Sequence, residues 1–323
     1  MRSVRRWSSP VIAAAALAVV VWRLGTGPFL TGIESVDGRA LLAAAAIFLV
    51  TTVCSAWRWT IVSRGLGVPL SLPAAVAAYY RAVFLNLMLP AGIAGDVHRG
   101  VSHGREVQDV GRALRAVWWE RAAGQVVQVL LAIAVLLVLP SPVRSSMPIV
   151  VVAAIAAVIG VVLVGRARAS GVGPSRWALV WHTVAADVRH GVLRRQALPA
   201  VVFGSAVVFV GHAATFFVAA RTAGVDAPVS RLLPLTLLAI LAMVLPSIGG
   251  WGPREGVTAW VFAAAGLGAA RGAETAVVYG VLVLAASLPG ALVLLVGWLP
   301  RRGASRTRSR ERMVFRPEGA ADA

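Results

Sequence analysis

The chain alternates between long apolar runs and shorter polar segments in which arginine is frequent. A membrane-spanning helix needs ~20 mostly apolar residues. Six runs meet or approach this length: Pro10–Leu24, Ala40–Val62, Arg115–Leu139, Met147–Val164, Ala197–Ala220 and Thr275–Leu299. The first run follows an arginine cluster and lacks a small-x-small cleavage site, so we expect a retained anchor rather than a cleaved signal peptide. The pattern predicts an all-α, polytopic integral membrane protein built as a helical bundle.

Two further apolar regions are too short to span a membrane. Ala74–Leu89 stops at Pro90, and Leu232–Leu245 stops at Pro246 before the chain resumes as Gly256–Ala270. Irregular backbone at membrane depth is tolerated where protein or a water-filled cavity shelters it. We therefore predict two broken or re-entrant helices. The residues that define these breaks are Pro90, Gly92, Gly95, Pro246, Gly249, Gly250 and Gly252.

The two breaks resemble each other in sequence. Leu89–Arg99 and Leu245–Arg254 both contain Leu-Pro, then glycines, and one deletion aligns Arg99 with Arg254. Under the topology predicted below, the chain enters the first break from the cytoplasm and the second from outside. Similar motifs that enter from opposite sides are typical of inverted repeats, which place a substrate site between broken helices.

Composition supports the membrane assignment and excludes several classes. Of 323 residues, 59% are hydrophobic and 14% are charged, and the formal charge is +18 with no lysine. One cysteine, Cys54, excludes a disulfide framework and a cysteine metal site. The arginines lie between apolar runs or in the tail, which does not suit nucleic-acid binding. No polar stretch is long enough for a soluble catalytic domain, so we expect no enzyme activity and no cofactor.

The arginines also predict the orientation. Cytoplasmic loops carry an excess of Arg and Lys, so the N-terminus, the loop with Arg58 and Arg64, the segments Arg99–Arg115 and Arg166–Arg195, and the tail are expected to be cytoplasmic. We therefore expect a protein of the plasma membrane with both termini in the cytoplasm. We divide the chain into an N-terminal anchor helix and outer loop (1–38), a transmembrane domain (39–300) and a disordered Arg-rich tail (301–323).

The candidate chemistry consists of charged side chains at membrane depth, which pair or line polar paths. Guanidinium groups bind phosphate through a planar fork, so Arg81, Arg99, Arg121 and Arg254 are candidates to bind a lipid phosphate. Asp96, Glu120 and Glu255 would balance them or engage a cationic headgroup. A phosphate-bearing lipid, such as an anionic phospholipid, is the partner that this set suits best.

Internal charge neutralisation is the alternative interpretation. Asp96 and Arg99 are three positions apart, and Glu120 could meet an arginine of a facing helix. Glu120–Arg121 and Arg254–Glu255 are adjacent pairs, which share no helix face, so each residue is expected to find its partner on another element. We interpret His98 and His103 as loop residues rather than metal ligands. For His212 we favour a helix–helix hydrogen bond over a proton relay. Tryptophans near span ends, Trp59 among them, suit an interfacial belt.

Several of these blocks resemble one family. They are Ser55–Trp59, Tyr80–Asn86, Leu89–Arg99, Trp119–Gly124, Leu245–Glu255 and Ser287–Gly290, and in order and spacing they are similar to the lysylphosphatidylglycerol synthase transmembrane region. The resemblance covers roughly residues 40–300 and implies a flippase-like domain. In multidomain members this region is associated with moving aminoacylated phosphatidylglycerol between leaflets. A short tail follows Leu299 here, so we do not expect the aminoacyl transfer of those members.

Three functional hypotheses follow from the sequence. The first is a flippase-like protein that translocates or binds a phosphate-bearing lipid, with or without a modified headgroup. The second is a non-transporting membrane scaffold for a lipid- or glycan-modifying enzyme. The third is a secondary transporter of a small anion. The oligomeric state is not predicted.

Overall fold

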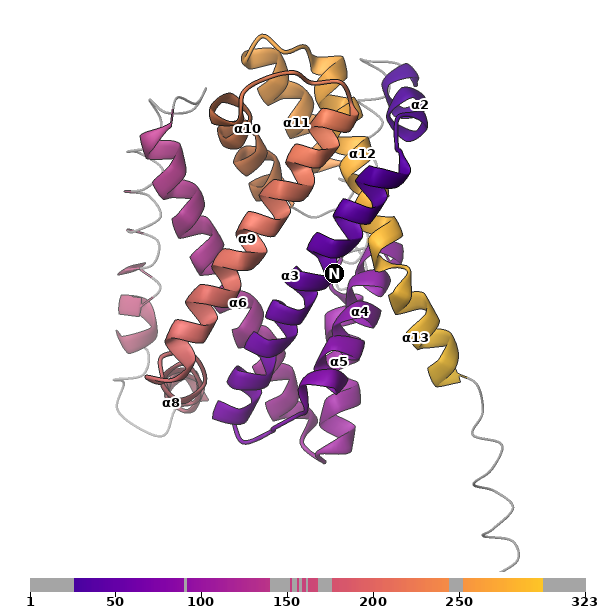
Figure 1. Cartoon of the computed structure of the whole chain (residues 1–323). Helices are drawn as coiled ribbons and strands as arrows, with labels where there is room; N and C mark the ends of the chain where they lie inside the picture. Colours follow the sequence, from indigo (N-terminus) through magenta and orange to yellow (C-terminus); the bar gives the residue numbers. More distant parts are fainter. Residues whose placement is uncertain are drawn as a thin grey trace, which may run out of the picture.

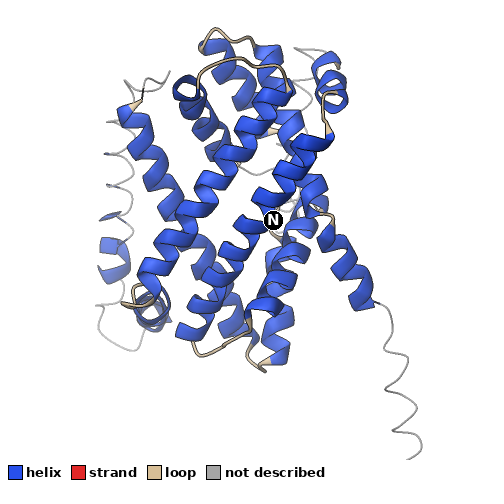
Figure 2. Cartoon of the chain, in the orientation of Figure 1, coloured by secondary structure: helices blue, strands red, loops and turns tan. Residues whose placement is uncertain are grey.

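The computed structural model describes residues 26–89, 92–139, 152, 156, 159–160, 162–167, 176–243 and 252–298. Every regular element among them is a helix (Figure 2). In chain order these are α2 Gly27–Glu34, α3 Gly38–Gly65, α4 Leu72–Met88, α5 Ala94–Glu106, α6 Val110–Val138, α8 Arg176–Asp187, the π-helix η2 Val188–Val192, α9 Ala197–Thr222, α10 Val229–Ala242, α11 Pro253–Ala264, α12 Ala269–Ser287 and α13 Pro289–Trp298. The predicted all-α helical membrane bundle is confirmed.

Four candidate spans are long and apolar enough to cross a bilayer: Gly38–Gly65, Val110–Val138, Ala197–Thr222 and Ala269–Val296. The first three confirm the spans predicted from Ala40, Arg115 and Ala197. The fourth begins six residues before the predicted Thr275 and consists of α12 and α13, which are separated at Leu288. Asp37 caps α3 by accepting from the amide of Ala40 at 2.7 Å. Pro10–Leu24 lies outside the described residues, as does most of Met147–Val164.

Two helical hairpins complete the bundle. In Figure 1, α4 and α5 lie beside the lower half of α3, whereas α10 and α11 lie at the upper end of the bundle. At 1.5 Å per residue, the 17 residues of α4 and the 14 of α10 extend ~25 and ~21 Å, less than the ~30 Å hydrocarbon core. In the first hairpin α4 runs upward and α5 returns downward, whereas in the second α10 runs downward and α11 returns upward. The two hairpins therefore have opposite directions, as predicted for the two re-entrant motifs.

The contacts between helices repeat between the two halves. α3 contacts α4 and α6, and α9 correspondingly contacts α10 and α12. α3 contacts α12 and α9 contacts α6, while α3 and α9 pack on each other at the centre. Replacing α3–α6 by α9–α12 therefore reproduces the same set of contacts. This pattern agrees with the predicted inverted repeats.

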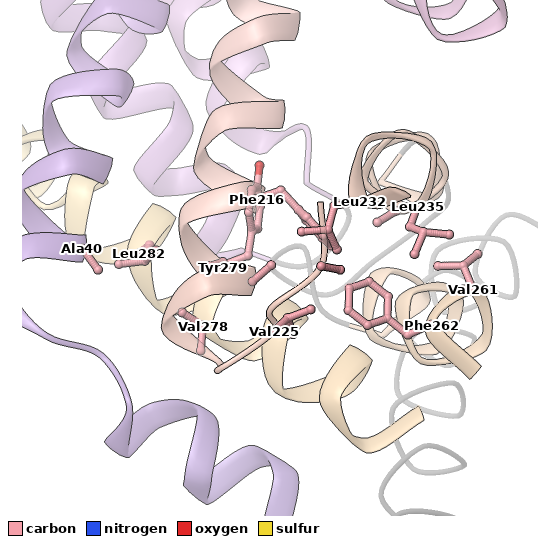
Figure 3. Close-up of a cluster of buried hydrophobic side chains, with 14 of the residues drawn as sticks. Ala40, Phe216, Val225, Leu232, Leu235, Val261, Phe262, Val278, Tyr279 and Leu282 are labelled. Atoms are coloured by element: carbon pink, nitrogen blue, oxygen red, sulfur yellow. The ribbon is translucent and has the colours of Figure 1, made fainter. Parts of the chain in front are cut away.

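The largest hydrophobic cluster holds the second half together. Phe216 of α9, Leu232 and Leu235 of α10, Phe262 of α11 and Tyr279 of α12 meet there, all at most 2% exposed (Figure 3). Ala40 of α3 extends the cluster to the first half. Because α3, α9, α10, α11 and α12 all contribute, the second hairpin (α10 and α11) is fixed against the flanking helices α9 and α12.

Four segments predicted as polar loops contain helical residues in the structure. Arg58 lies within α3 and is 6% exposed, and Arg99 lies in α5 and is 1% exposed. The excess of arginine in cytoplasmic loops placed both in polar segments, yet each is buried against a carboxylate partner. The segment Arg166–Gln196 contains α8 and η2, and the loop before α3 contains α2. The predicted tail, residues 301–323, lies outside the described residues.

Candidate functional site

Glu120 lies at the centre of a buried ionic cluster in the first half. Its Oε1 accepts hydrogen bonds from Arg58 of α3, whose Nε is 2.8 Å away. Its Oε2 accepts from Arg99 Nη2 of α5 at 2.8 Å. The Glu120 side chain is fully buried, so both guanidinium groups compensate its charge away from water. One carboxylate thus joins α3, α5 and α6, and the prediction that Glu120 meets an arginine of a facing helix is confirmed.

The cluster extends from the first half to the second through Arg58. Its Nη1 donates to Ser205 Oγ on α9 at 2.8 Å. Gly124 on α6 leaves the space that this guanidinium needs, because a Cβ there would lie 2.7 Å from Arg58 Nη1. Helix α6 thus provides a carboxylate and, one turn later, a bare backbone surface against the same arginine.

Arg99 is held by aromatic rings as well as by carboxylates. Its Cζ lies 4.1 Å from the ring centroid of Tyr79 and 4.6 Å from that of Trp59. Such contacts stabilise a desolvated cation through the electron-rich ring face. Trp59 is fully buried, so its assignment to an interfacial belt is wrong. The Nη1 of Arg99 is buried and has no hydrogen-bond partner among the described residues.

Asp96 organises the turn of the first hairpin. Its Oδ1 accepts from Arg99 Nε at 2.9 Å, and its Oδ2 accepts from Arg121 and, at 2.7 Å, from Asn86 Nδ2 of α4. The predicted pairing of Asp96 with Arg99 is confirmed. Asn86 Oδ1 accepts from the amide of Gly95 at 2.7 Å, which ties the end of α4 to the start of α5.

Glycine at position 95 is required by close helix packing. A Cβ there would lie 2.0 Å from the backbone oxygen of Ala82 on α4. Gly92 in the preceding turn has φ +62°, a left-handed conformation that glycine adopts without strain. Pro90 lies outside the described residues. The two described glycines of the first break therefore have separate roles, one in the turn and one in packing.

Two arginines of this region are accessible. The side chain of Arg121 is 47% exposed although it bonds Asp96. Arg81 of α4 is half-buried, and its buried Nε has no partner among the described residues. Burial, followed by the positive charges of Arg81 and Arg105, lowers the pKa of His98 on α5. Helix α4, which carries Arg81, packs directly on α5.

The second hairpin carries a separate cluster. Arg254 Nε donates to Glu255 Oε1 at 3.0 Å, and Glu255 Oε2 accepts from the amide of Gly252 at 2.6 Å. The prediction that these adjacent residues find their partners only on other elements is wrong, because the flexible arginine folds back over the start of α11. Arg254 also lies over the ring of Tyr279, 5.2 Å from its centroid. Gly252 has φ +108°, whereas Pro246, Gly249 and Gly250 lie outside the described residues.

His212 links α9 to α12. Its Nδ1 lies 3.0 Å from the hydroxyl of Tyr279, which confirms the favoured helix–helix hydrogen bond. His212 also lines a small cavity with Thr51 and Thr215, large enough for a water molecule. Among the described residues, no three His, Cys, Asp or Glu side chains lie close enough to hold a metal ion.

The comparison with protein families finds a match over nearly the whole chain. Residues 7–312 match the family described as the lysylphosphatidylglycerol synthase TM region. The chain belongs to this family. The comparison with curated proteins and the comparison with solved structures returned no match.

The family blocks coincide with the ionic clusters. In this lysylphosphatidylglycerol synthase TM region, Trp59 and Arg58 belong to the first block, and Glu120 and Gly124 to the fourth. Gly290, from the last block, packs α13 against α4, since a Cβ there would lie 2.2 Å from the backbone oxygen of Tyr80. Arg99, Arg121, Asp96 and Glu120 come together as one set, whereas Arg254 and Glu255 form the second.

Sequence reasoning missed several contributors to this family's clusters. The arginine distribution marks Arg58 only as a determinant of topology, although its position in the same block as Trp59 is a signal for a role in the site. Asn86, whose amide side chain joins the two helices of the first hairpin, enters the sequence analysis only as the last residue of the block Tyr80–Asn86. Ser205 has no sequence signal, because a single serine in an apolar span is common.

Proposed function

We propose that this protein is a flippase-like membrane protein that moves a phosphate-bearing lipid between leaflets, with Arg121 as the principal phosphate contact. The observation that carries the proposal is the pair of charged helical hairpins that enter the bundle from opposite ends (Figure 1). Membership of a transmembrane family whose name refers to lysylphosphatidylglycerol synthesis supports a lipid as the partner.

The charge balance of the first cluster favours an anion. Three guanidinium groups, those of Arg58, Arg99 and Arg121, face the carboxylates of Asp96 and Glu120. One positive charge is therefore in excess, before Arg81 is counted. A lipid phosphate would offset this excess, and its acyl chains would stay in the surrounding hydrocarbon.

The arginines divide into two roles in this proposal. Arg121 is half-exposed and could exchange Asp96 for a phosphate, with Arg81 as a second accessible cation. Arg99 and Arg254 are buried against carboxylates and aromatic rings, so they maintain the hairpin turns and the positive potential around them. Asp96 and Glu255 balance the turns in the empty state or engage a cationic headgroup.

The proposed orientation follows the arginine distribution. The lower end in Figure 1 would face the cytoplasm, with both termini on that side of the plasma membrane. The first hairpin would then be entered from the cytoplasm and the second from outside. The protein would act without catalysing a covalent step, and a lipid- or glycan-modifying enzyme could supply or use the lipid.

A transport assay tests the proposal. Fluorescent phosphatidylglycerol is followed across the bilayer of proteoliposomes that contain wild type, Arg121→Gln or the matched control Arg112→Gln. Both arginines lie on α6, pair with an aspartate and have half-exposed side chains, 47% and 48%. Because a hydrogen bond to a charged group contributes about 1.5–3 kcal/mol, we expect Arg121→Gln to slow movement about tenfold or more and Arg112→Gln to leave it unchanged.

The other outcomes separate the rival functions. An equal loss in both variants would contradict a specific phosphate contact at Arg121. Movement of a soluble anion without movement of any lipid would favour the secondary transporter. If wild type moves neither anionic, zwitterionic nor aminoacylated lipids faster than empty liposomes, autonomous lipid movement is excluded and the scaffold hypothesis remains.

A further inference from the structure

Helix α8 differs from the spanning helices in its orientation. Figure 1 shows α8 almost end-on at the lower end of the bundle, in a view that shows α3, α6 and α9 from the side. Its axis therefore runs across the direction of the spans. A helix in this orientation at the end of a membrane bundle lies along the interface between hydrocarbon and headgroups.

The side chains of α8 suit that interface. Trp177, Leu179 and Val180 are 59%, 71% and 52% exposed. Each of these large apolar groups exposes more than half of its surface, and interfacial helices bury such surface at the boundary of the acyl chains. Leu193, just after η2, is 57% exposed and extends the apolar surface toward the start of α9.

Uncompensated positive charge lies beside this apolar surface. Arg189 of η2 and the following Arg194 and Arg195 are all exposed. Asp187 is the only acidic residue between Arg176 and Gln196. It is buried and accepts hydrogen bonds from Arg115 Nε at 2.8 Å and Trp119 Nε1 at 3.1 Å on α6. Its charge is therefore already paired, and the three arginines remain for a partner.

The surface is fixed firmly to the bundle. η2 is a π-helix, a form that often occurs at functional positions, and it contacts α3, α6 and α9. Gly65, the last residue of α3, packs so closely on it that a Cβ would lie 2.5 Å from the backbone oxygen of His190. The same three helices carry Arg58, Glu120 and Ser205. A ligand on η2 would therefore hold the ends of the helices that form the first ionic cluster.

From these observations we propose that α8, η2 and the segment 193–195 form a binding surface for anionic phospholipid headgroups of the leaflet at this end of the bundle. The apolar residues insert at the acyl-chain boundary, while Arg189, Arg194 and Arg195 bind the phosphates. This surface is distinct from Arg121 and does not depend on lipid movement. Each arginine near an anionic membrane surface strengthens binding by a factor of about five.

Lipid-specific quenching at α8 tests the proposal. In the full-length protein with Cys54→Ala, an environment-sensitive fluorophore is attached at Leu179→Cys and the protein is reconstituted in phosphatidylcholine vesicles that contain a minor fraction of phosphatidylglycerol. Brominated chains are carried either by the phosphatidylglycerol or by an equal fraction of the phosphatidylcholine. We expect brominated phosphatidylglycerol to quench several-fold more than brominated phosphatidylcholine.

Two triple variants locate the effect. In Arg189→Gln/Arg194→Gln/Arg195→Gln, the two brominated lipids should quench the fluorophore equally. Arg39→Gln/Arg231→Gln/Arg271→Gln removes three exposed arginines from the opposite end and should retain the preference. Arg121→Gln should retain it as well, which separates this surface from the proposed transport site. Equal quenching in the parent protein, or quenching by neither lipid, would overturn the proposal.

Discussion

Glu120 of α6 binds Arg58 of α3 through one carboxylate oxygen and Arg99 of α5 through the other, with all three side chains buried. The pairing explains how two arginines can lie inside a membrane bundle. Each guanidinium loses its hydration on burial, and a shared carboxylate together with aromatic or hydroxyl neighbours replaces it. The first hairpin is therefore fixed by charge, whereas the second is fixed mainly by the hydrophobic cluster around Phe216 and Phe262.

The equivalent pair in the second half is uncharged. Arg58 and Glu120 link the first and last helices of their half, α3 and α6. His212 and Tyr279 link α9 and α12 in the same way. An arginine of each hairpin then lies against the residue on the last helix, Arg99 against Glu120 and Arg254 over Tyr279. The two halves thus share this arrangement of helices, and Arg254 pairs with the carboxylate of Glu255 while it lies over the ring of Tyr279.

Removal of the central carboxylate should destabilise the protein strongly. Glu120→Gln leaves Arg58 and Arg99 buried without their shared counter-charge. Breaking a buried ion pair by removing one partner costs about 3–5 kcal/mol, so we expect a large fall in thermal stability in detergent or loss of folded protein. The control Glu106→Gln changes an exposed carboxylate at the end of α5. A melting temperature for Glu120→Gln equal to that of Glu106→Gln would show that the pairing contributes little.

The packing of the first hairpin should be sensitive to a single methyl group. In Gly95→Ala the added Cβ would overlap the backbone oxygen of Ala82 and force α4 and α5 apart. Overpacking costs about 1–3 kcal/mol, and separation would also weaken the bond from Gly95 to Asn86. Gly111→Ala is the control, since the atom nearest to its Cβ is 3.8 Å away. We expect lower stability and slower lipid movement for Gly95→Ala only; unchanged values for both variants would contradict this packing role.

The fold was largely predictable because apolar length and prolines determine it directly. The spans from Ala40, Arg115 and Ala197 and the short helix before Pro90 were recognised from these features. Helix α8 was not recognised, because its 12 residues are too few for a spanning helix and its orientation depends on the contact of Asp187 with Arg115. A helix across the membrane surface leaves little trace in a pattern read for spanning segments.

The site was predictable in residue type but not in pairing. Asp96, Arg99 and Glu120 were identified because charges are costly at membrane depth. Which carboxylate meets which arginine depends on how α3, α5 and α6 pack. The arginine distribution places Arg58 in a cytoplasmic loop, although the apolar run Ala40–Val62 contains it and α3 continues to Gly65. The fold-back of Arg254 onto Glu255 depends on side-chain conformation at a helix start, which residue spacing does not determine.

The hydrogen bond between His212 and Tyr279 should contribute much less to the free energy of unfolding than the ionic cluster around Glu120 does. Tyr279→Phe removes the hydroxyl bonded to His212 but keeps the ring beneath Arg254. Interhelical hydrogen bonds in membrane proteins contribute about 0.6 kcal/mol on average. We expect a small decrease in unfolding free energy, measured by denaturation in mixed micelles. A loss as large as that of Glu120→Gln would mean that this hydroxyl supports more than one helix contact.

The opposite directions of the two hairpins can be tested by the sidedness of their first residues. Ser71 precedes α4 and Ser230 lies in the first turn of α10, and both are exposed. In a Cys54→Ala background, Ser71→Cys and Ser230→Cys are treated with a membrane-impermeant maleimide before and after the cells are permeabilised. Because the hairpins begin at opposite ends of the bundle, we expect Ser230→Cys to react in intact cells and Ser71→Cys only after permeabilisation. The reverse result would keep the inverted arrangement but invert the proposed orientation, whereas reaction of both from one side would contradict the inverted hairpins themselves.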